Sequence, residues 1–163
     1  MKMIIAVSGG IDSVVLLHVL KAEATHELVV AHVDHGIRVD SREDESFVRQ
    51  TAHTYGLTYE STQLELGQGA SEELARDKRY EWLREIQQKH GAETIVTAHH
   101  QDDVIETMII NILRGTGWRG LCSLSEHDET KRPLLGWSKA RIVNYALEHN
   151  LSWRDDSTND NVR

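Results

Sequence analysis

Residues 8–13 read Ser-Gly-Gly-Ile-Asp-Ser, and the rest of the chain is organised around this stretch. The preceding residues 3–7, Met-Ile-Ile-Ala-Val, are apolar and rich in β-branched side chains, which favours a buried strand. The following residues 14–20, Val-Val-Leu-Leu-His-Val-Leu, contain no helix breaker and favour a buried helix. The sequence therefore predicts a strand, a tight glycine turn and a helix in succession.

A turn of this kind can bind phosphate. Glycine lets the main chain approach an anion closely, and the start of a helix presents unpaired N–H groups with a partial positive charge. Ser8 and Ser13 add hydroxyl donors, and Asp12 adds a carboxylate that can hold Mg²⁺ beside the phosphates. A Walker A loop is excluded because Asp12 stands where that motif needs lysine. The structural alternative is a plain strand-to-helix turn with a serine N-cap.

Composition sets limits on the class of protein. The chain has 163 residues with a net charge of −8, which argues against gripping a nucleic acid by bulk electrostatics. No apolar run approaches the roughly 20 residues that span a bilayer, and no signal peptide opens the chain. Cys122 is the single cysteine, which excludes an internal disulfide. We expect one cytoplasmic domain over residues 1–163 without a membrane partner.

Strand patterns alternate with helix patterns along the chain, and three strands are continuous apolar runs, as expected when helices cover both faces. We predict an α/β fold with a doubly wound, mostly parallel sheet flanked by helices. Ligands bind such sheets at the carboxyl ends of the strands, where the polar clusters 8–13, 34–35 and 99–103 fall. The expected strands are 3–7, 28–33, 58–64, 94–98, 131–135 and 151–153, and the expected helices are 14–20, 40–55, 71–90, 101–113 and 138–149.

The helix expected from residue 101 begins with acidic residues. Asp103 and Glu106 are i, i+3 neighbours on one face, and Asp102 and Glu106 are i, i+4 neighbours. Carboxylates beside a phosphate site can hold a metal, bind an ammonium group or accept a proton from an amine nucleophile. The structural alternative is a capping acid followed by a solvated helix face.

Histidines and basic residues add weaker signals. A zinc site at His32, His35, His99 and His100 is disfavoured because the spacing matches no known motif and cysteine ligands are missing. Contact with nucleotide phosphates or burial in the core is favoured for these histidines. Candidate phosphate or RNA-backbone contacts are Arg76, Lys78, Arg79, Arg114 and Arg119. For the first three, a solvated helix face is the commoner explanation.

Several stretches together resemble the N-terminal catalytic domain of the bacterial tRNA(Ile)-lysidine synthase family, within the N-type ATP pyrophosphatases. The resemblance runs from residue 4 to the end of the chain. The stretches are Ser8-Gly9-Gly10-Ile11-Asp12-Ser13, His32-Val33-Asp34-His35-Gly36-Ile37-Arg38, Ala75-Arg76-Asp77-Lys78-Arg79-Tyr80, Thr97-Ala98-His99-His100-Gln101-Asp102-Asp103-Val104-Ile105-Glu106-Thr107, Arg114-Gly115-Thr116-Gly117, Arg132-Pro133-Leu134-Leu135 and Asp156-Ser157-Thr158-Asn159.

The resemblance implies a Rossmann-like, adenine nucleotide alpha hydrolase-like fold and a ligase that uses ATP and Mg²⁺. The implied reaction adenylates the wobble cytidine of tRNA(Ile) with a CAU anticodon, and free L-lysine then replaces AMP to give lysidine. It implies a catalytic domain over residues 1–163 without the family's C-terminal domains, and it leaves a homodimer open.

The same resemblance assigns roles to individual residues. Asp12 would organise Mg²⁺ or assist catalysis, Asp103 and Glu106 would bind the lysine ammonium and take its proton, and Arg114 would neutralise phosphate charge. The residues that would bind the nucleotide are Ser8, Gly9, Gly10, Ile11, Asp12, Ser13, Asp34, His35 and His99.

Two rival functions remain open at this point. A tRNA thiolase shares the glycine turn, but thiolation commonly needs paired cysteines, and Cys122 stands alone. A non-catalytic nucleotide-binding module would bind ATP without releasing pyrophosphate, and it would not need Asp103 and Glu106.

Overall fold

The computed structural model describes residues 1–34, 41–64, 71–113, 115 and 130–154, and these form one five-stranded sheet with five helices. The strands are β1 (Lys2–Ala6), β2 (Glu27–Asp34), β3 (Thr58–Gln63), β4 (Thr94–Val96) and β5 (Thr130–Lys131). The helices are α1 (Ile11–Glu23), α2 (Ser41–Thr54), α3 (Glu72–His90), α4 (Gln101–Leu113) and α5 (Lys139–Glu148). The strictly alternating order confirms the predicted α/β class.

All strand pairs are parallel, and the order across the sheet is β3-β2-β1-β4-β5. β1 lies in the middle, where Ile4 pairs with Val29 of β2 on one side and with Ile95 of β4 on the other. The chain runs outward from β1 to β3 and then returns to the far side of β1. The topological switch point therefore lies between β1 and β4, where ligands bind in doubly wound sheets.

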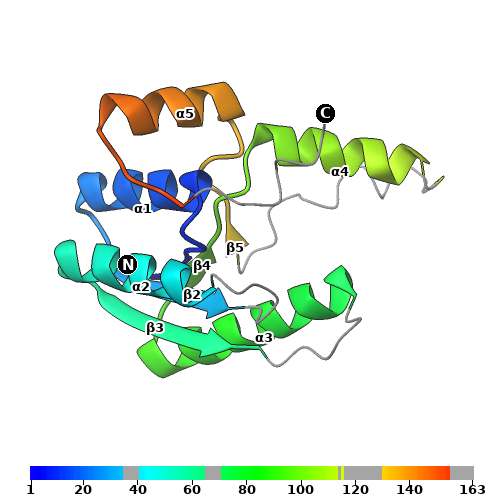
Figure 1. Cartoon of the computed structure of the whole chain (residues 1–163). Helices are drawn as coiled ribbons and strands as arrows, with labels where there is room; N and C mark the ends of the chain where they lie inside the picture. Colours follow the sequence, from blue (N-terminus) through cyan, green and yellow to red (C-terminus); the bar gives the residue numbers. More distant parts are fainter. Residues whose placement is uncertain (35–40, 65–70, 114, 116–129, 155–163) are drawn as a thin grey trace.

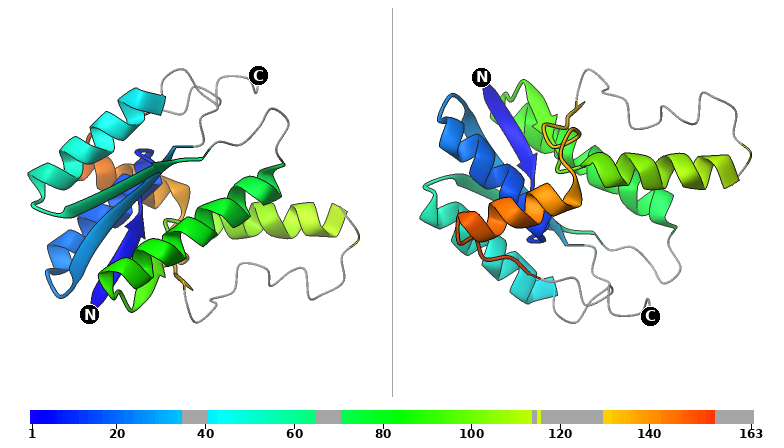
Figure 2. Two further views of the ribbon diagram at one scale, coloured as in Figure 1. Left: turned by 90° about the horizontal axis from the view of Figure 1, so that it is seen from below. Right: turned by 90° about the horizontal axis from the view of Figure 1, so that it is seen from above.

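Two apolar cores lie on the two faces of the sheet (Figures 1 and 2). On one face α1, α2 and α5 pack together, and the fully buried Leu16, Val48 and Ile142 come from these three helices in turn. On the other face α3 packs alone through Leu83 and Ile86. Burial on both faces explains why β1 and β2 read as apolar runs, whereas the edge strand β3 is partly exposed throughout.

Helix ends follow the predicted capping residues. Ser71 and Ser138 cap α3 and α5 by accepting hydrogen bonds from the main-chain N–H groups of Leu74 and Arg141. Gly91 ends α3 in the left-handed region with φ of 59°. Local side-chain chemistry therefore fixes where both helices begin and where α3 stops.

Two predicted strands are wrong in part or in full. Residues 133–136 form a turn closed by Leu135 N–H donating to the Arg132 carbonyl (3.1 Å), so β5 ends at Lys131. Residues 151–153 are not a strand either. The Leu151 N–H bonds to the end of α5 at the Ala146 carbonyl (2.9 Å), and the Arg154 N–H bonds to the Gly9 carbonyl (3.0 Å), so no ladder forms.

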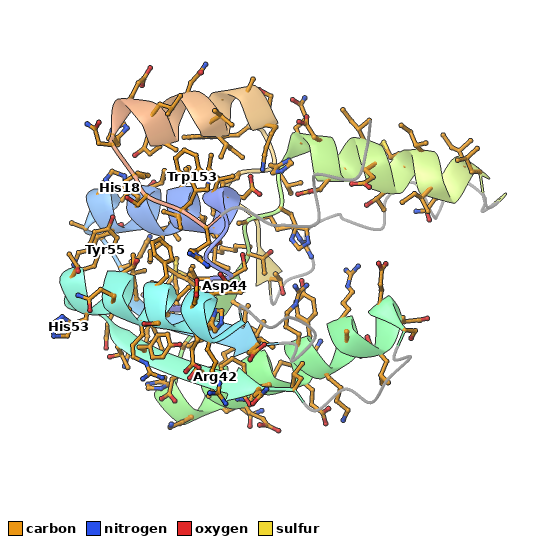
Figure 3. The ribbon with its side chains drawn as sticks, viewed as in Figure 1. His18, Arg42, Asp44, His53, Tyr55 and Trp153 are labelled. Carbon is orange, nitrogen blue, oxygen red and sulfur yellow. The ribbon has the colours of Figure 1, made fainter. Side chains whose placement is uncertain are left out.

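An aromatic and histidine cluster joins α1 to α5. His18 Nδ1 lies 3.0 Å from the Tyr145 hydroxyl, and the His18 ring also contacts Tyr55 at the end of α2 (Figure 3). Burial lowers the pKa of His18, and the positive charge of nearby His149 lowers it further. This packing fixes α5 against α1, with the first residue of α5 directed at the predicted site.

Helix α4 extends away from the sheet (Figures 1 and 2) and has no buried residue. Its exposed apolar side chains include Ile109 (52% exposed) and Leu113 (81% exposed). Across the described part of the chain, no helix is long and apolar enough to span a membrane.

Candidate nucleotide-binding site

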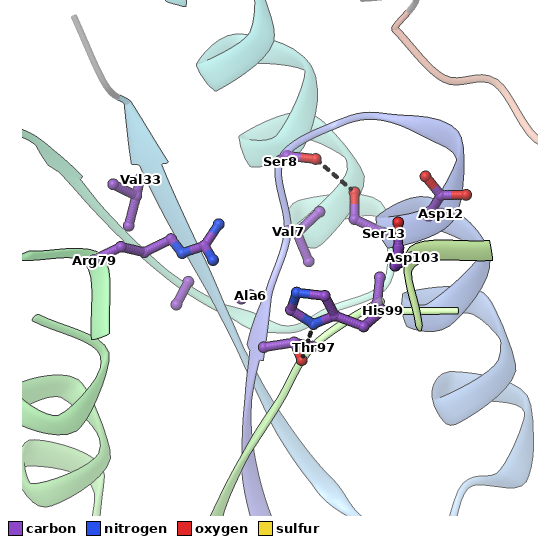
Figure 4. A pocket seen from close by; sticks show the side chains of 12 residues that line it. Ala6, Val7, Ser8, Asp12, Ser13, Val33, Arg79, Thr97, His99 and Asp103 are labelled. Carbon is purple, nitrogen blue, oxygen red and sulfur yellow. Dashed lines mark hydrogen bonds between the residues drawn. The ribbon is translucent and has the colours of Figure 1, made fainter. Parts of the chain in front are cut away.

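A cavity of about 300 Å³ opens at the carboxyl ends of β1, β2 and β4 (Figure 4). Its floor is made of small or apolar side chains, among them Ala6 and Val33. Of the predicted site residues, the ones that line it are Ser8, Asp12, Ser13, His99 and Asp103, together with Arg79 from the candidate phosphate contacts. The structure therefore brings together two motifs that stand about 90 positions apart in the sequence.

The two serines of the turn bond to each other and to the main chain. Ser13 Oγ donates to the Gly10 carbonyl (2.8 Å) and accepts the Gly9 N–H (3.2 Å). Since its single proton is used in this way, the Ser8 hydroxyl is the donor in the 3.2 Å Ser8–Ser13 contact. Ser8 Oγ also accepts the Gly10 N–H (3.3 Å). These bonds hold the turn in one shape without a ligand.

Gly9 is required by the shape of this turn. Its φ of 100° lies in the region that only glycine adopts without strain, and a Cβ there would lie 3.3 Å from Val48 Cγ2. The Gly9 carbonyl also accepts the N–H of Arg154, whose guanidinium bonds to Asp44 (3.0 Å) at the start of α2. Contacts from α2 and from the segment after α5 therefore hold the turn in place.

Asp12 lies in the first turn of α1 with two partners. The Lys139 ammonium at the start of α5 is 2.6 Å from Asp12 Oδ1, and His100 Nε2 is 3.5 Å from the same oxygen. His100 Nδ1 accepts the main-chain N–H of Asp102 (3.2 Å), so neutral His100 carries its proton on Nε2, facing Asp12. Sequence reasoning missed Lys139 because the pair spans 127 positions.

His99 lies inside the cavity, with Nδ1 2.9 Å from the hydroxyl of the buried Thr97. Burial lowers the pKa of His99 to about 4, and the positive charge of Arg132 acts in the same direction. The imidazole is therefore neutral at pH 7 and offers the cavity a hydrogen-bonding group without charge. His32 is different, because it is buried and bonds to the Val7 carbonyl (2.8 Å), which is a core role.

The acidic residues of α4 divide into two kinds. Asp103 lines the cavity, and its Oδ2 also accepts the N–H of His100 (2.8 Å), which caps the helix. Asp102 accepts the main-chain N–H of Lys139 (3.1 Å), which ties α4 to α5. Glu106 is exposed and is not part of the cavity lining. Of the predicted pair, Asp103 therefore lies in the cavity, whereas Glu106 lies in solvent on the next turn of α4.

Arg79 from α3 lines the cavity on the side opposite Asp12 and Ser13 (Figure 4). Its Nε is buried and has no hydrogen-bond partner among the described residues. A buried guanidinium donor without a partner is costly, and an anionic or carbonyl group of a ligand would satisfy it. The solvated-face explanation is therefore wrong for Arg79. Only the three-dimensional fold shows that this face of α3 turns towards the cavity.

Some predicted site residues are not in the cavity lining or lie outside the described residues. Gly9, Gly10 and Ile11 belong to the turn without being part of that lining, and Asp34 ends β2. His35, Arg114 and the stretch 156–159 lie outside the described residues.

The sequence profile of the PP-loop domain family matches residues 1–163, the whole chain. The chain belongs to this family. A PP-loop domain implies the use of ATP, which fits a glycine turn at the start of a helix that opens into a cavity.

The chain is also similar to curated proteins named tRNA(Ile)-lysidine synthase. It is 38% identical to one from Exiguobacterium sibiricum over 161 residues, covering 96% of this chain and 39% of that protein. It is 39% identical to one from Bacteroides thetaiotaomicron over 166 residues, covering 97% of this chain and 39% of that protein. The chain thus spans about two fifths of the length of these curated relatives.

Solved structures confirm the fold. The U34-tRNA thiolase NcsA from Methanococcus maripaludis superposes with a TM-score of 0.81 at 18% identity, over 95% of this chain and 58% of that one. The NH3-dependent NAD synthetase from Campylobacter jejuni superposes with a TM-score of 0.61 at 13% identity, over 92% of this chain and 64% of that one. At these identities the likeness concerns the PP-loop fold alone.

The residues present fit a magnesium ion held jointly with phosphates. Mg²⁺ in phosphate sites is bound by one or two carboxylates together with substrate oxygens and water. Asp12 and Asp103 line the same cavity, and the Lys139 ammonium at Asp12 shows that this carboxylate is placed to receive a cation. No cluster of three or more metal-ligating side chains occurs among the described residues.

Proposed function

We propose that this chain attaches free L-lysine to C2 of the wobble cytidine of tRNA(Ile) with a CAU anticodon, using ATP and producing lysidine, AMP and pyrophosphate. The observation that carries the proposal is the single cavity that joins the glycine turn to the Asp103 carboxylate. A purely nucleotide-binding module has no need of that carboxylate. The names of the relatives that are 38–39% identical supply the substrate.

In the first step, the cytidine O2 attacks the α-phosphorus of ATP, and the bond from that phosphorus to the bridging oxygen breaks as pyrophosphate leaves. Ser8, Ser13 and the main-chain N–H groups at the start of α1 bind the phosphates. Arg79 binds an anionic or carbonyl group on the other side of the cavity, satisfying its buried Nε. When bound, a Mg²⁺ ion held by Asp12 would neutralise phosphate charge.

In the second step, the lysine ε-amine attacks C2, and the bond from C2 to the adenylated oxygen breaks as AMP leaves. An amine with a pKa of about 10.4 is protonated at pH 7 and must lose a proton to act as a nucleophile. Asp103 and Glu106 bind the ammonium and accept that proton. Arg114 is proposed to neutralise phosphate charge, and Asp34 and His35 are proposed to bind the nucleotide.

The wider setting is part of the proposal. Residues 1–163 act as an N-type ATP-pyrophosphatase catalytic domain. The acidic net charge of −8 fits a domain that makes local contacts with the anticodon rather than gripping the whole tRNA. The reaction takes place in the cytoplasm, where tRNA, ATP and free lysine occur together, and a homodimer is compatible with it.

The test is the intact mass of tRNA(Ile) with a CAU anticodon after incubation with this chain, ATP, Mg²⁺ and lysine. A gain of one lysine less one water is expected, and omission of lysine is the control. If the chain is inactive alone, the same assay is run on the chain joined to the remainder of a full-length relative. A gain equal to sulfur with a sulfur donor, or no gain in either form, would overturn the proposal.

A further inference from the structure

The Lys139–Asp12 contact is the starting point, because stability does not account for it. The two atoms lie 2.6 Å apart, yet the side chains are 43% and 30% exposed. An ion pair this exposed to water contributes only about 0–1 kcal/mol. The Lys139 ammonium nevertheless contacts Asp12, the one carboxylate within residues 8–13. The contact therefore points to a role in the site.

The main chain of Lys139 is firmly held. Its N–H donates to Asp102 Oδ2 (3.1 Å), the preceding Ser138 caps α5, and the Gln101 N–H bonds to the Trp137 carbonyl (3.0 Å). These contacts fix the start of α5 against the start of α4. The ammonium of the flexible lysine side chain, by contrast, has only the Asp12 oxygen as a polar partner within the described part of the chain. The ammonium can therefore change position beside Asp12, which lines the cavity, while the main chain of Lys139 stays fixed.

The neighbouring basic residues lie elsewhere. Arg141, on the same helix, stacks on the Trp137 ring at 3.9 Å from the ring centroid. Arg79 lies across the cavity from Asp12 (Figure 4). Lys139 is thus the ammonium placed beside the carboxylate of the PP-loop turn, with His100 Nε2 3.5 Å from the same oxygen. An ammonium there competes with Mg²⁺ for Asp12 and is free to bind phosphate oxygens once Mg²⁺ arrives with the nucleotide.

We infer that Lys139 binds the β- and γ-phosphates of ATP, which leave as pyrophosphate. The inference rests on the proposed use of ATP and deepens it, because it assigns a residue from α5 to the leaving group. Lysine is suited to this task as a compact, mobile positive charge that follows the phosphate.

The test compares Lys139→Met with Lys139→Arg and with Lys2→Met. Lys2 pairs with Glu27 at 2.8 Å at the opposite end of the sheet, so its removal deletes an exposed ion pair outside the site. Dissociation constants for ATP, AMP and pyrophosphate are measured by calorimetry with Mg²⁺ present. We expect Lys139→Met to weaken ATP and pyrophosphate by about tenfold or more and to leave AMP unchanged. Arginine should restore part of the loss, and Lys2→Met should match the unchanged chain.

Equal weakening of ATP and AMP would overturn the inference, because it would show that Lys139 only supports the shape of the turn. Unchanged binding of all three ligands would overturn it as well, while leaving the proposed function intact. Failure of the unchanged chain to bind ATP would contradict the proposed function itself, and with it the role of Lys139.

Discussion

Helices α1 and α4 each carry one half of the site, but they are held in opposite ways. Leu16 and its apolar neighbours on α1 are buried between the sheet and α5, whereas α4 has no buried residue and exposes Ile109 and Leu113. The phosphate-binding half is therefore built into the core. The carboxylate half is positioned by contacts in the first turn of α4, through Asp103, Asp102 and Gln101.

The largest expected effect tests this contrast directly. Leu16→Ala should lower the free energy of unfolding by about 2–5 kcal/mol, because it opens a cavity in the core. Ile109→Ala should change it by less than about 0.5 kcal/mol, because that side chain is 52% exposed. Urea denaturation of both variants gives the two values. A large loss in Ile109→Ala would show that α4 is packed against a part of the chain outside the described residues.

The next effect concerns the turn itself. Gly9→Ala should weaken ATP binding by about 100-fold, because alanine at φ of 100° is strained and its Cβ would press on Val48. Gly56→Ala is the matched control, since Gly56 also has a positive φ of 66° but open space around its Cα and lies at the end of α2. Both variants should lose some stability, and calorimetry should show a loss of ATP affinity in Gly9→Ala alone.

A smaller effect is expected on the carboxylate half. Glu106→Gln should raise the KM for lysine by about tenfold, because a charge-assisted bond to the ammonium is lost, with ATP binding unchanged. Glu73→Gln, an exposed acid in the first turn of α3, is the control and should behave as the unchanged chain. Equal loss of lysine use and ATP binding would instead indicate a structural or metal-binding role for Glu106.

The smallest effect is a dependence of stability on pH through His99. The pKa of His99 is about 4 when folded and near 6.5 when unfolded, so the unfolded chain binds the proton more readily. Its contribution to stability is therefore complete above pH 6.5 and is lost as the pH falls towards 4. We expect His99→Gln to reduce the loss of stability between pH 6.5 and 5 by roughly 1 kcal/mol, measured by urea denaturation. The exposed His53, replaced by glutamine, serves as the control.

Local signals in the sequence were enough to predict most of the fold. The capping serines Ser71 and Ser138 fixed two helix starts, and the apolar runs of β1 and β2 indicated a sheet covered on both faces. The predicted strand at 151–153 is wrong. The apolar side chain of Trp153 packs against the core beside α1 and does not belong to a strand. Alternating polarity alone cannot distinguish such a segment from an edge strand.

The site was predictable only where its residues follow a strand directly. Ser8, Asp12 and Asp103 come immediately after β1 and β4, so topology alone brings them to one edge. Lys139 reaches Asp12, and Arg79 reaches the cavity, from helices whose rotation depends on tertiary packing. The sequence around a residue on an amphipathic helix does not show which neighbouring element its side chain will contact.

The central position of β1 has a consequence for synthesis of the chain. β1 leaves the ribosome well before β4, which begins at Thr94 and pairs with one edge of β1. At about 5–20 residues per second, that edge waits roughly 5–18 s for its partner. During this time the apolar sequence around Ile4 and Ile5 presents an open strand edge. The nascent chain is therefore exposed to aggregation at this edge from the synthesis of β1 until β4 is made.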